Sequence, residues 1–226
     1  MIHFGYAQCD ITPQEAMPLV GFYREEETCK GVLKPLLAQV SVWEDDSNSK
    51  KCLITVDSLG FTTDLTNELR DKVGNCLGIE REQVMFCFSH THSAPDPTDS
   101  RFTYFDLVCG RVLAAVEEAN SKLCPVDIGW DNVEADIGVN RRNKGAEIDK
   151  RVGILKVCEE DTDEIRLIIL RVTAHANSYK RDNYYVSPDF FGDIREIVGA
   201  HFNCPVMIVQ GAAGNVAPKY FCSEET

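Results

Sequence analysis

Residues 84–93 have the sequence VMFCFSHTHS, in which five apolar residues are followed directly by a polar segment with two histidines. Continuous apolar runs of this length are typical of strands that are buried on both faces of a sheet. Three further runs have the same form, at residues 52–56, 167–170 and 206–209. The sequence therefore predicts four buried strands at these positions.

Amphipathic helices are predicted beside these strands. Residues 65–77 carry an apolar residue at every fourth position, and residues 105–116 follow the i, i+3, i+4, i+7 pattern. We expect a third helix to begin with Ser187 as N-cap and Pro188 at the first helical position. Strands interleaved with helices predict a single α/β domain over residues 1–226, with a mixed, largely parallel sheet flanked by helices.

Two other segments show strand patterns. The polar stretch 44–51 separates β-compatible residues 37–43 from 52–57, which predicts a hairpin. Residues 126–139 alternate between apolar and polar, which predicts an antiparallel strand pair at one side of the sheet.

Composition narrows the classes of function. The chain of 226 residues has 23 Lys+Arg, 36 Asp+Glu and a net charge of −13, which argues against nucleic acid as the main partner. No apolar run has the roughly 18–20 residues that span a bilayer, and the amino terminus lacks the pattern of a signal peptide. Ten cysteines without a C-x-x-C pair indicate free thiols, so we expect a cytoplasmic protein. The sequence is compatible with a homo-oligomer.

Polar residues follow each of the four apolar runs. Asp57 follows the first run, His90 and His92 the second, His175 the third, and residues 211–215 the fourth. Ligands of open α/β sheets bind beyond the carboxyl ends of the strands. We therefore expect these four endings to form one site.

The pair His90 and His92 is the sharpest signal for a metal. In extended backbone, residues two apart project to the same side, so both imidazoles can face one centre. Catalytic zinc takes three protein ligands and keeps one position open, and His175 is a candidate for a further ligand. The alternative, that the two histidines cap the next helix, stays open.

Other side chains allow both a functional and a structural interpretation. Asp57 could orient a ligand histidine, act as a base, or cap the following turn. The small residues from Gly211 to Asn215 could admit a ligand and donate backbone N–H groups to an oxyanion, or form a tight turn. Arg141 and Arg142 could clamp a carboxylate, a phosphate or an oxyanion, although the residues alone favour a solvated loop.

Four stretches together resemble the amino-terminal region of the neutral/alkaline, non-lysosomal ceramidase family. They are DITP at 10–13 followed by Gly21-Phe22, SHTHSAP at 89–95, GVNRR at 138–142 and QGAAGNVAP at 210–218, in family order. The resemblance implies a zinc enzyme that hydrolyses the amide of a ceramide and releases a fatty acid and a sphingoid base.

The resemblance also implies roles for individual residues. His90 and His175 correspond to zinc ligands, and His92 to a catalytic partner near the metal. Arg141 corresponds to the arginine that helps to hold substrate, and Arg142 could take that role. The candidate substrate-binding residues are Gly211, Asn215 and Arg142, and the candidate catalytic residues are His92, Arg141 and Asp57.

The sequence departs from the family pattern at several points. Ala217 stands where the family has a serine that takes part in hydrolysis, Asn215 where it has aspartate, and Ala94 where it has glycine. The family's other zinc ligands, a glutamate and a tyrosine, come later in its chains, and no segment up to Thr226 matches them. We therefore expect a chain without the later part of the catalytic region, its metal shell completed by Asp57, His92 or a second subunit.

Two functions follow as hypotheses. The first is a metal-dependent hydrolase that cleaves an amide or ester of a lipid-like or small acyl substrate with metal-activated water. The second is a catalytically inactive, truncated domain that binds a ligand or a partner subunit.

Overall fold

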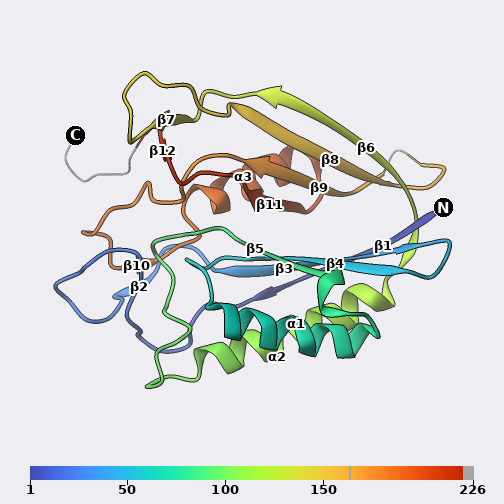
Figure 1. Cartoon of the computed structure of the whole chain (residues 1–226), viewed down its shortest axis with the longest axis horizontal. Helices are drawn as coiled ribbons and strands as arrows, with labels where there is room; N and C mark the ends of the chain where they lie inside the picture. The colour runs from blue at the N-terminus through green and yellow to red at the C-terminus, as the bar shows by residue number, and fades with distance from the viewer. Residues whose placement is uncertain (163, 221–226) are drawn as a thin grey trace.

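A computed structural model describes residues 1–162 and 164–220 and shows one eight-stranded sheet with three α-helices (Figure 1). The strand order is β11-β9-β8-β6-β1-β3-β4-β5. The strands are β1 (Ile2–Asp10), β3 (Leu37–Asp45), β4 (Lys50–Val56), β5 (Val84–Phe88), β6 (Cys124–Glu134), β8 (Arg151–Glu159), β9 (Ile165–Val172) and β11 (Val206–Gln210). The helices are α1 (Thr63–Leu77), α2 (Tyr104–Ser121) and α3 (Phe190–Phe202).

Short elements complete the fold. A 3-10 turn, η1 (Arg81–Gln83), leads into β5. Two small two-stranded sheets pair distant parts of the chain: β2 (Gly31–Val32) with β10 (Tyr185–Val186), and β7 (Gly138–Asn140) with β12 (Val216–Pro218). None of the helices within the described residues is long and apolar enough to cross a membrane.

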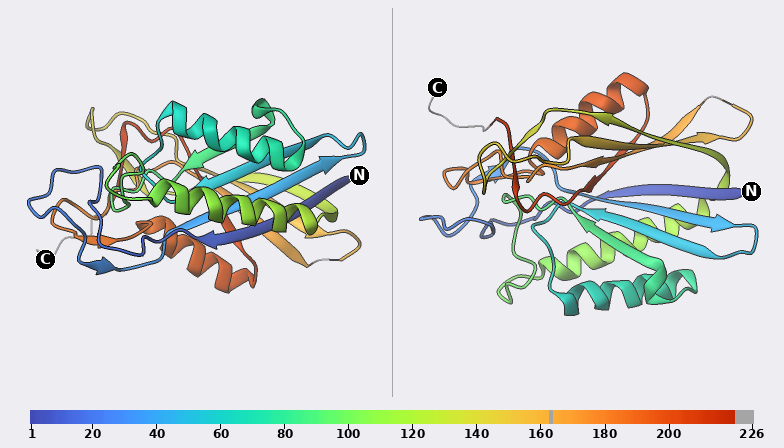
Figure 2. Two further views of the ribbon diagram at one scale, coloured as in Figure 1. Left: turned by 90° about the horizontal axis from the view of Figure 1, so that it is seen from below. Right: turned by 45° about the horizontal axis from the view of Figure 1, so that its top comes forward.

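The large sheet is folded over into two halves (Figures 1 and 2). Strands β1, β3, β4 and β5 form one half, covered by α1 and α2, and strands β6, β8, β9 and β11 form the other, beside α3. The halves are joined where Ile2–Phe4 of β1 pairs with Cys124–Val126 of β6. Strand β11 comes back into contact with β4 and β5. The order of layers is therefore helices, half-sheet, half-sheet, helix.

The folding of the sheet explains the continuous apolar runs. In β9, Ile168 and Leu170 pack in the cluster beneath α3, whereas Leu167 and Ile169 pack in the cluster between the two halves. In β3, Val40 faces the helices of its own half. Because these strands are covered on both faces, apolar residues are stabilising at consecutive positions.

The structure confirms a mixed α/β fold, strands at all four predicted positions, the 37–57 hairpin and the first two helices, but edge strand β5 leaves Met85 58% exposed. The expectation of a largely parallel sheet is wrong. Only β4 with β5 and β9 with β11 are parallel, and the other five neighbouring pairs are antiparallel. The physical reason is that the apolar runs report burial on both faces, which the folded sheet also gives to antiparallel strands.

Two further expectations need correction. Helix α3 begins at Phe190 with Asp189 as N-cap, rather than with Ser187 and Pro188, and the Asp189 carboxylate accepts a hydrogen bond from Phe190 N at 2.8 Å. Residues 126–139 do not form a strand pair at one side. Strand β6 lies in the middle of the sheet between β1 and β8, and β7 pairs with β12.

Candidate metal centre

His90, His92 and His175 meet at one edge of the folded sheet. Their ring centroids lie 4.7 to 5.5 Å apart. Each ring offers one nitrogen atom, and these three nitrogen atoms all lie within 4.8 Å of one another. His90 and His92 follow β5 in one half of the sheet, and His175 follows β9 in the other half. The expected convergence holds for the endings of β5, β9 and β11, which meet beside the histidines, whereas Asp57 after β4 pairs with Arg195 instead.

Backbone carbonyl groups orient all three imidazoles through Nδ1. The Nδ1 atoms of His90, His92 and His175 lie 2.5, 3.0 and 3.3 Å from carbonyl oxygens of Leu59, Gly21 and Ala213, respectively. A carbonyl oxygen can only accept, so each Nδ1 carries the proton. In a neutral ring with the proton on Nδ1, Nε2 is unprotonated, and Nε2 is the atom that binds a metal when Nδ1 donates to the backbone.

The donor set fits a divalent metal ion. The Nε2 atoms of His92 and His175 are 3.0 Å apart, and with both Nδ1 atoms protonated neither Nε2 has a hydrogen to share. Two lone pairs at that separation repel each other, and a cation between them removes the repulsion. Imidazole nitrogen suits zinc, copper, iron and nickel.

Two residues at this site have a positive φ, a backbone conformation that residues other than glycine rarely adopt. His90 has φ of 60°, in the left-handed region, and such residues concentrate at functional sites. Gly21 has φ of 99°, and a Cβ added there would lie 2.5 Å from Cγ of His92. The ring of Phe22 lies 4.6 Å from the ring of His92, and Arg24 Nη2 donates to the His92 carbonyl at 2.8 Å. The segment from Gly21 to Arg24 thus holds His92 in place.

The surroundings keep two of the histidines uncharged. Burial, assisted by the neighbouring imidazoles of His175 and His90, lowers the pKa of His92 to about 4. Burial likewise lowers the pKa of His175 to about 4, assisted by the positive charge of Arg141. Both rings are therefore neutral near pH 7, as a metal ligand must be.

A cavity of about 410 Å³ opens beside His90 and His175. One part of its wall is apolar, formed by Leu59, Phe86 and Phe88, and the other part carries the histidines. The remaining lining residues include Cys87, Gln210, Gly211, Ala213 and Gly214. Such a cavity can hold an apolar group beside the metal-binding nitrogens.

Asp57 forms an ion pair with Arg195 and makes no hydrogen bond to any of the three histidine rings. Its carboxylate receives two hydrogen bonds from Arg195, at 3.1 and 2.5 Å, and one from Leu37 N at 2.9 Å. The expectation that Asp57 orients a ligand histidine is wrong, because backbone carbonyls perform that task at all three rings. As a base, Asp57 is also disfavoured because both of its carboxylate oxygens accept hydrogen bonds from Arg195.

The two arginines differ in their contacts. Arg141 donates from Nε and Nη2 to the carbonyl of Gly214, at 3.1 and 2.9 Å, and from its backbone N to Asn215 O at 2.9 Å. The guanidinium of Arg142 has no hydrogen bond or ion pair with any residue that the structure describes. Arg141 is therefore tied to the loop that borders the cavity, and Arg142 lies in the exposed segment after β7.

The two other predicted substrate-binding residues, Gly211 and Asn215, differ in their position relative to the cavity. Gly211 lines the cavity, and a Cβ there would lie 2.3 Å from Thr173 Oγ1, so the close approach of the chain requires glycine. Asn215 is exposed and is not among the residues that line the cavity. Ala217 is buried in β12, opposite Val139 of β7.

The backbone carbonyl groups that orient the three imidazole rings could not be predicted from the sequence. The carbonyls of Leu59 and Ala213 carry no side-chain signal, so no pattern of residue types could reveal them. Gly21 is different, because it belongs to a motif that the sequence already singled out, and its positive φ explains why glycine stands there.

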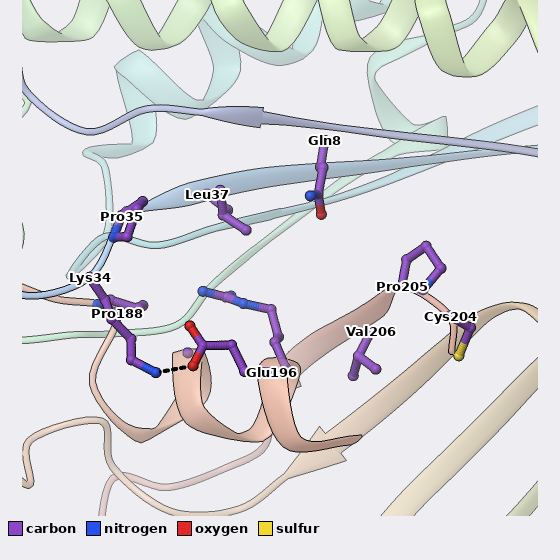
Figure 3. A pocket seen from close by; sticks show the side chains of 11 residues that line it. Gln8, Lys34, Pro35, Leu37, Pro188, Glu196, Cys204, Pro205 and Val206 are labelled. Atoms are coloured by element: carbon purple, nitrogen blue, oxygen red, sulfur yellow. Dashed lines mark hydrogen bonds and ion pairs between the residues drawn. The ribbon is translucent and has the colours of Figure 1, made fainter. Parts of the chain in front are cut away.

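A second cavity, of about 280 Å³, lies between β3 and α3 (Figure 3). Lys34 reaches across it to Glu196, and Arg195 of the Asp57 ion pair also lines it. None of the three histidines borders this cavity. It belongs to the packing of α3 on the folded sheet rather than to the candidate metal centre.

Comparisons with known proteins point to one fold. No protein-family model matches the chain, and no curated protein sequence matches it. Among solved structures, neutral ceramidase from Pseudomonas aeruginosa superposes with a TM-score of 0.84 at 19% identity, over 100% of this chain and 40% of that one. A ceramidase complexed with C2 also gives a TM-score of 0.84, at 20% identity, over 96% of this chain and 38% of that one.

The resemblance expected from the sequence is thus confirmed at the level of the fold. Both ceramidases are less than 25% identical to this chain, and the chain spans about two fifths of their length. The chain is similar in fold, over its whole described core, to about two fifths of a neutral ceramidase.

Proposed function

We propose that the chain is a metal-dependent hydrolase that cleaves an amide or ester bond of a lipid-like or small acyl substrate. The observation that carries this proposal is the set of three imidazoles whose Nδ1 atoms donate to backbone carbonyls, beside a partly apolar cavity. The shared fold with proteins described as ceramidases supports it.

In this proposal His90, His92 and His175 hold a zinc ion through Nε2. When bound, zinc supplies Lewis-acid polarisation of a carbonyl oxygen and activation of water at neutral pH. The chain's own contribution is to keep His92 and His175 neutral and to aim the three rings at one point. Three protein ligands leave a position open, as catalytic zinc sites do.

The cavity and Arg141 account for substrate binding. The apolar wall of Leu59, Phe86 and Phe88 takes the acyl chain, which is stabilised by the removal of apolar surface from water. Arg141, held by the Gly214 carbonyl, places a positive charge next to the histidines. That charge favours the carbonyl oxygen of the substrate and the carboxylate of the product.

One observation favours a second function, a domain that binds an acyl ligand without turnover. Ala217 is buried in β12 and offers no hydroxyl at the position where the sequence resemblance places a serine. In this case the cavity and the metal-binding histidines remain, and only the chemical step is lost.

Metal analysis of the purified chain tests the metal centre. The protein is stripped with a chelator, reloaded with zinc and analysed for metal per chain. We expect one zinc per chain in the wild type and loss of zinc in His90→Ala and His175→Ala. His201→Ala, on the exposed side of α3, is the matched control and retains zinc. A wild type that takes up no zinc overturns the proposal.

An activity panel separates the two functions and defines His92. The panel contains N-acyl amides and aryl esters with acyl chains of increasing length. Metal-dependent turnover supports the hydrolase, and ligand binding without turnover supports the inactive domain. Loss of both zinc and turnover in His92→Ala identifies His92 as a ligand. Loss of turnover with zinc retained identifies it as the catalytic partner that the family resemblance implies.

A further inference from the structure

Most of strand β6 has one unpaired edge. Residues Val126–Glu134 pair with β8 along their full length, whereas β1 pairs only with Cys124–Val126. Within the described residues, the β1-side edge of 127–134 has no strand partner, and every residue from Asp127 to Glu134 is exposed. Figure 1 shows β6 continuing well past the point where it meets β1. An unpaired edge offers backbone N–H and C=O groups to another strand.

The two faces of this edge carry different chemistry. Ile128 and Trp130 lie on one face, and Trp130 is 75% exposed. Asp127 and Asp131 lie on the opposite face together with Val133, which is 49% exposed, because side chains alternate along a strand, and Glu134 follows on the face of Ile128 and Trp130. A tryptophan exposed to this extent next to an exposed isoleucine is a typical feature of a contact surface.

The acidic side chains on this edge are uncompensated. Within the described residues, Asp127 and Asp131 form no ion pair. Lys156 of β8 lies opposite Gly129, between them in register, and forms no ion pair with either. A strand added to the free edge would place its own side chains beside these carboxylates.

These observations define the chemistry of a partner. Side chains next to Ile128 and Trp130 must be apolar, and those next to Asp127 and Asp131 must be basic, because cross-strand pairs of opposite charge are stabilising. We propose that the free edge of β6 binds an extended polypeptide segment with alternating apolar and basic residues, which adds a strand to the sheet. This inference is independent of the metal centre and of the proposed hydrolase activity.

A second copy of the chain fits this edge poorly. Antiparallel pairing of β6 with its own copy about Gly129 would bring the carboxylates of Asp127 and Asp131 opposite one another, and every other register would still bring two acidic chains together. Like charges directly opposite each other destabilise a strand pair, and the chain carries a net charge of −13. Charge therefore selects a basic partner strand over self-association.

Peptide binding to the full chain tests the inference. The probe is an acetylated nine-residue peptide of alternating valine and lysine, and the control peptide has the same composition with all lysines before all valines. We expect the alternating peptide to bind more tightly, to shift the emission of Trp130 to shorter wavelength, and to slow amide hydrogen exchange in residues 127–134. Equal binding of both peptides, or no binding, overturns the inference.

Substitutions locate the binding site. Asp127→Lys with Asp131→Lys should weaken binding of a labelled alternating peptide by about tenfold, because two attractive pairs become repulsive. Trp130→Ser should also weaken it. Glu117→Lys on α2 and Tyr23→Ser, both exposed and distant in sequence from β6, are the matched controls and should bind as the wild type does. Sedimentation that shows a dimer, with exchange in 127–134 already slowed without peptide, would instead identify a second copy as the occupant and overturn the inference.

Discussion

The Nε2 atoms of His92 and His175 lie 3.0 Å apart, although 83 positions separate the two residues in the sequence. Each ring donates its Nδ1 proton to a backbone carbonyl, Gly21 for His92 and Ala213 for His175. The two unprotonated nitrogens therefore face each other. An arrangement that is repulsive in the metal-free chain becomes favourable when a cation occupies the space between the rings.

The first prediction concerns the pH dependence of the metal-free protein. The pKa of His92 and of His175 is about 4 in the folded chain, against an ordinary value of 6.5. The unfolded chain thus binds more protons than the folded chain between these values, so the free energy of unfolding falls as pH decreases from 6.5 to 4. Urea unfolding in the presence of a chelator, from pH 4 to pH 8, measures this slope. The double variant His92→Gln, His175→Gln should lose most of it, and an unchanged slope in that variant contradicts the prediction.

The second prediction concerns Gly21. Alanine there combines a left-handed φ of 99° with a Cβ only 2.5 Å from Cγ of His92. We expect Gly21→Ala to destabilise the fold by about 1–3 kcal/mol and to weaken zinc binding, because His92 must move. Thermal unfolding and a competitive zinc titration measure the two effects.

Gly110 provides the matched control for Gly21. It is exposed on α2, and a Cβ added there meets no atom within 4 Å. Gly110→Ala should stabilise the protein by about 0.5–1 kcal/mol through helix propensity and leave zinc affinity unchanged. Equal effects of the two substitutions on zinc affinity would show that Gly21 does not position His92.

The third prediction concerns the ion pair of Asp57 and Arg195. Both side chains are buried, at 2% and 10% exposure, and the pair links β4 of one half-sheet to α3 beside the other. Arg195→Met leaves a buried carboxylate without its partner and should destabilise the fold by about 3–5 kcal/mol. Arg81→Met, which breaks the exposed pair with Asp71, should cost less than about 1 kcal/mol. Similar losses in chemical denaturation for the two variants would be evidence against a structural role for the buried pair.

The fourth prediction separates the two arginines. Arg141 is bound to the Gly214 carbonyl and lies close enough to His175 to lower its pKa, whereas the guanidinium of Arg142 has no such contact in the described chain. Given a substrate from the activity panel, Arg141→Gln should raise KM by about tenfold or more, which is the size of a lost charge-assisted hydrogen bond, with zinc content unchanged. Arg142→Gln should leave KM within about twofold of the wild type. The reverse order would transfer the substrate role to Arg142.

The regular elements that were predictable share one property, a strong local pattern. Strands β5 and β9 are continuous apolar runs, and α1 has a clear apolar stripe that includes Leu69 and Val73. Strand β1 escaped prediction because small residues such as Gly5 and Ala7 face α2, where a Cβ on Gly5 would lie 1.9 Å from Ala119 O. A strand that packs against a helix with small residues has little apolar signal.

In the candidate site, too, some residues were predictable from the sequence and others were not. The pattern His90-Thr91-His92 and the position of His175 after a buried strand indicated the histidines without any structure. The partner of Asp57 could not be found from sequence, because Arg195 lies 138 residues away on a helix whose docking depends on the folded sheet. The carbonyls that orient the rings likewise have no signature in residue types.

The amino-acid sequence alone established which residues build buried strands, which histidines end those strands, and that the chain is acidic, because these properties are local. Only the tertiary structure decided that the sheet folds over, that most of its strands are antiparallel, and that His175 meets His90 and His92 from the opposite half. The physical reason is that apolar runs specify burial but not the direction of the neighbouring strand. That direction depends on how the two half-sheets pack together, and the packing brings the histidines to one point.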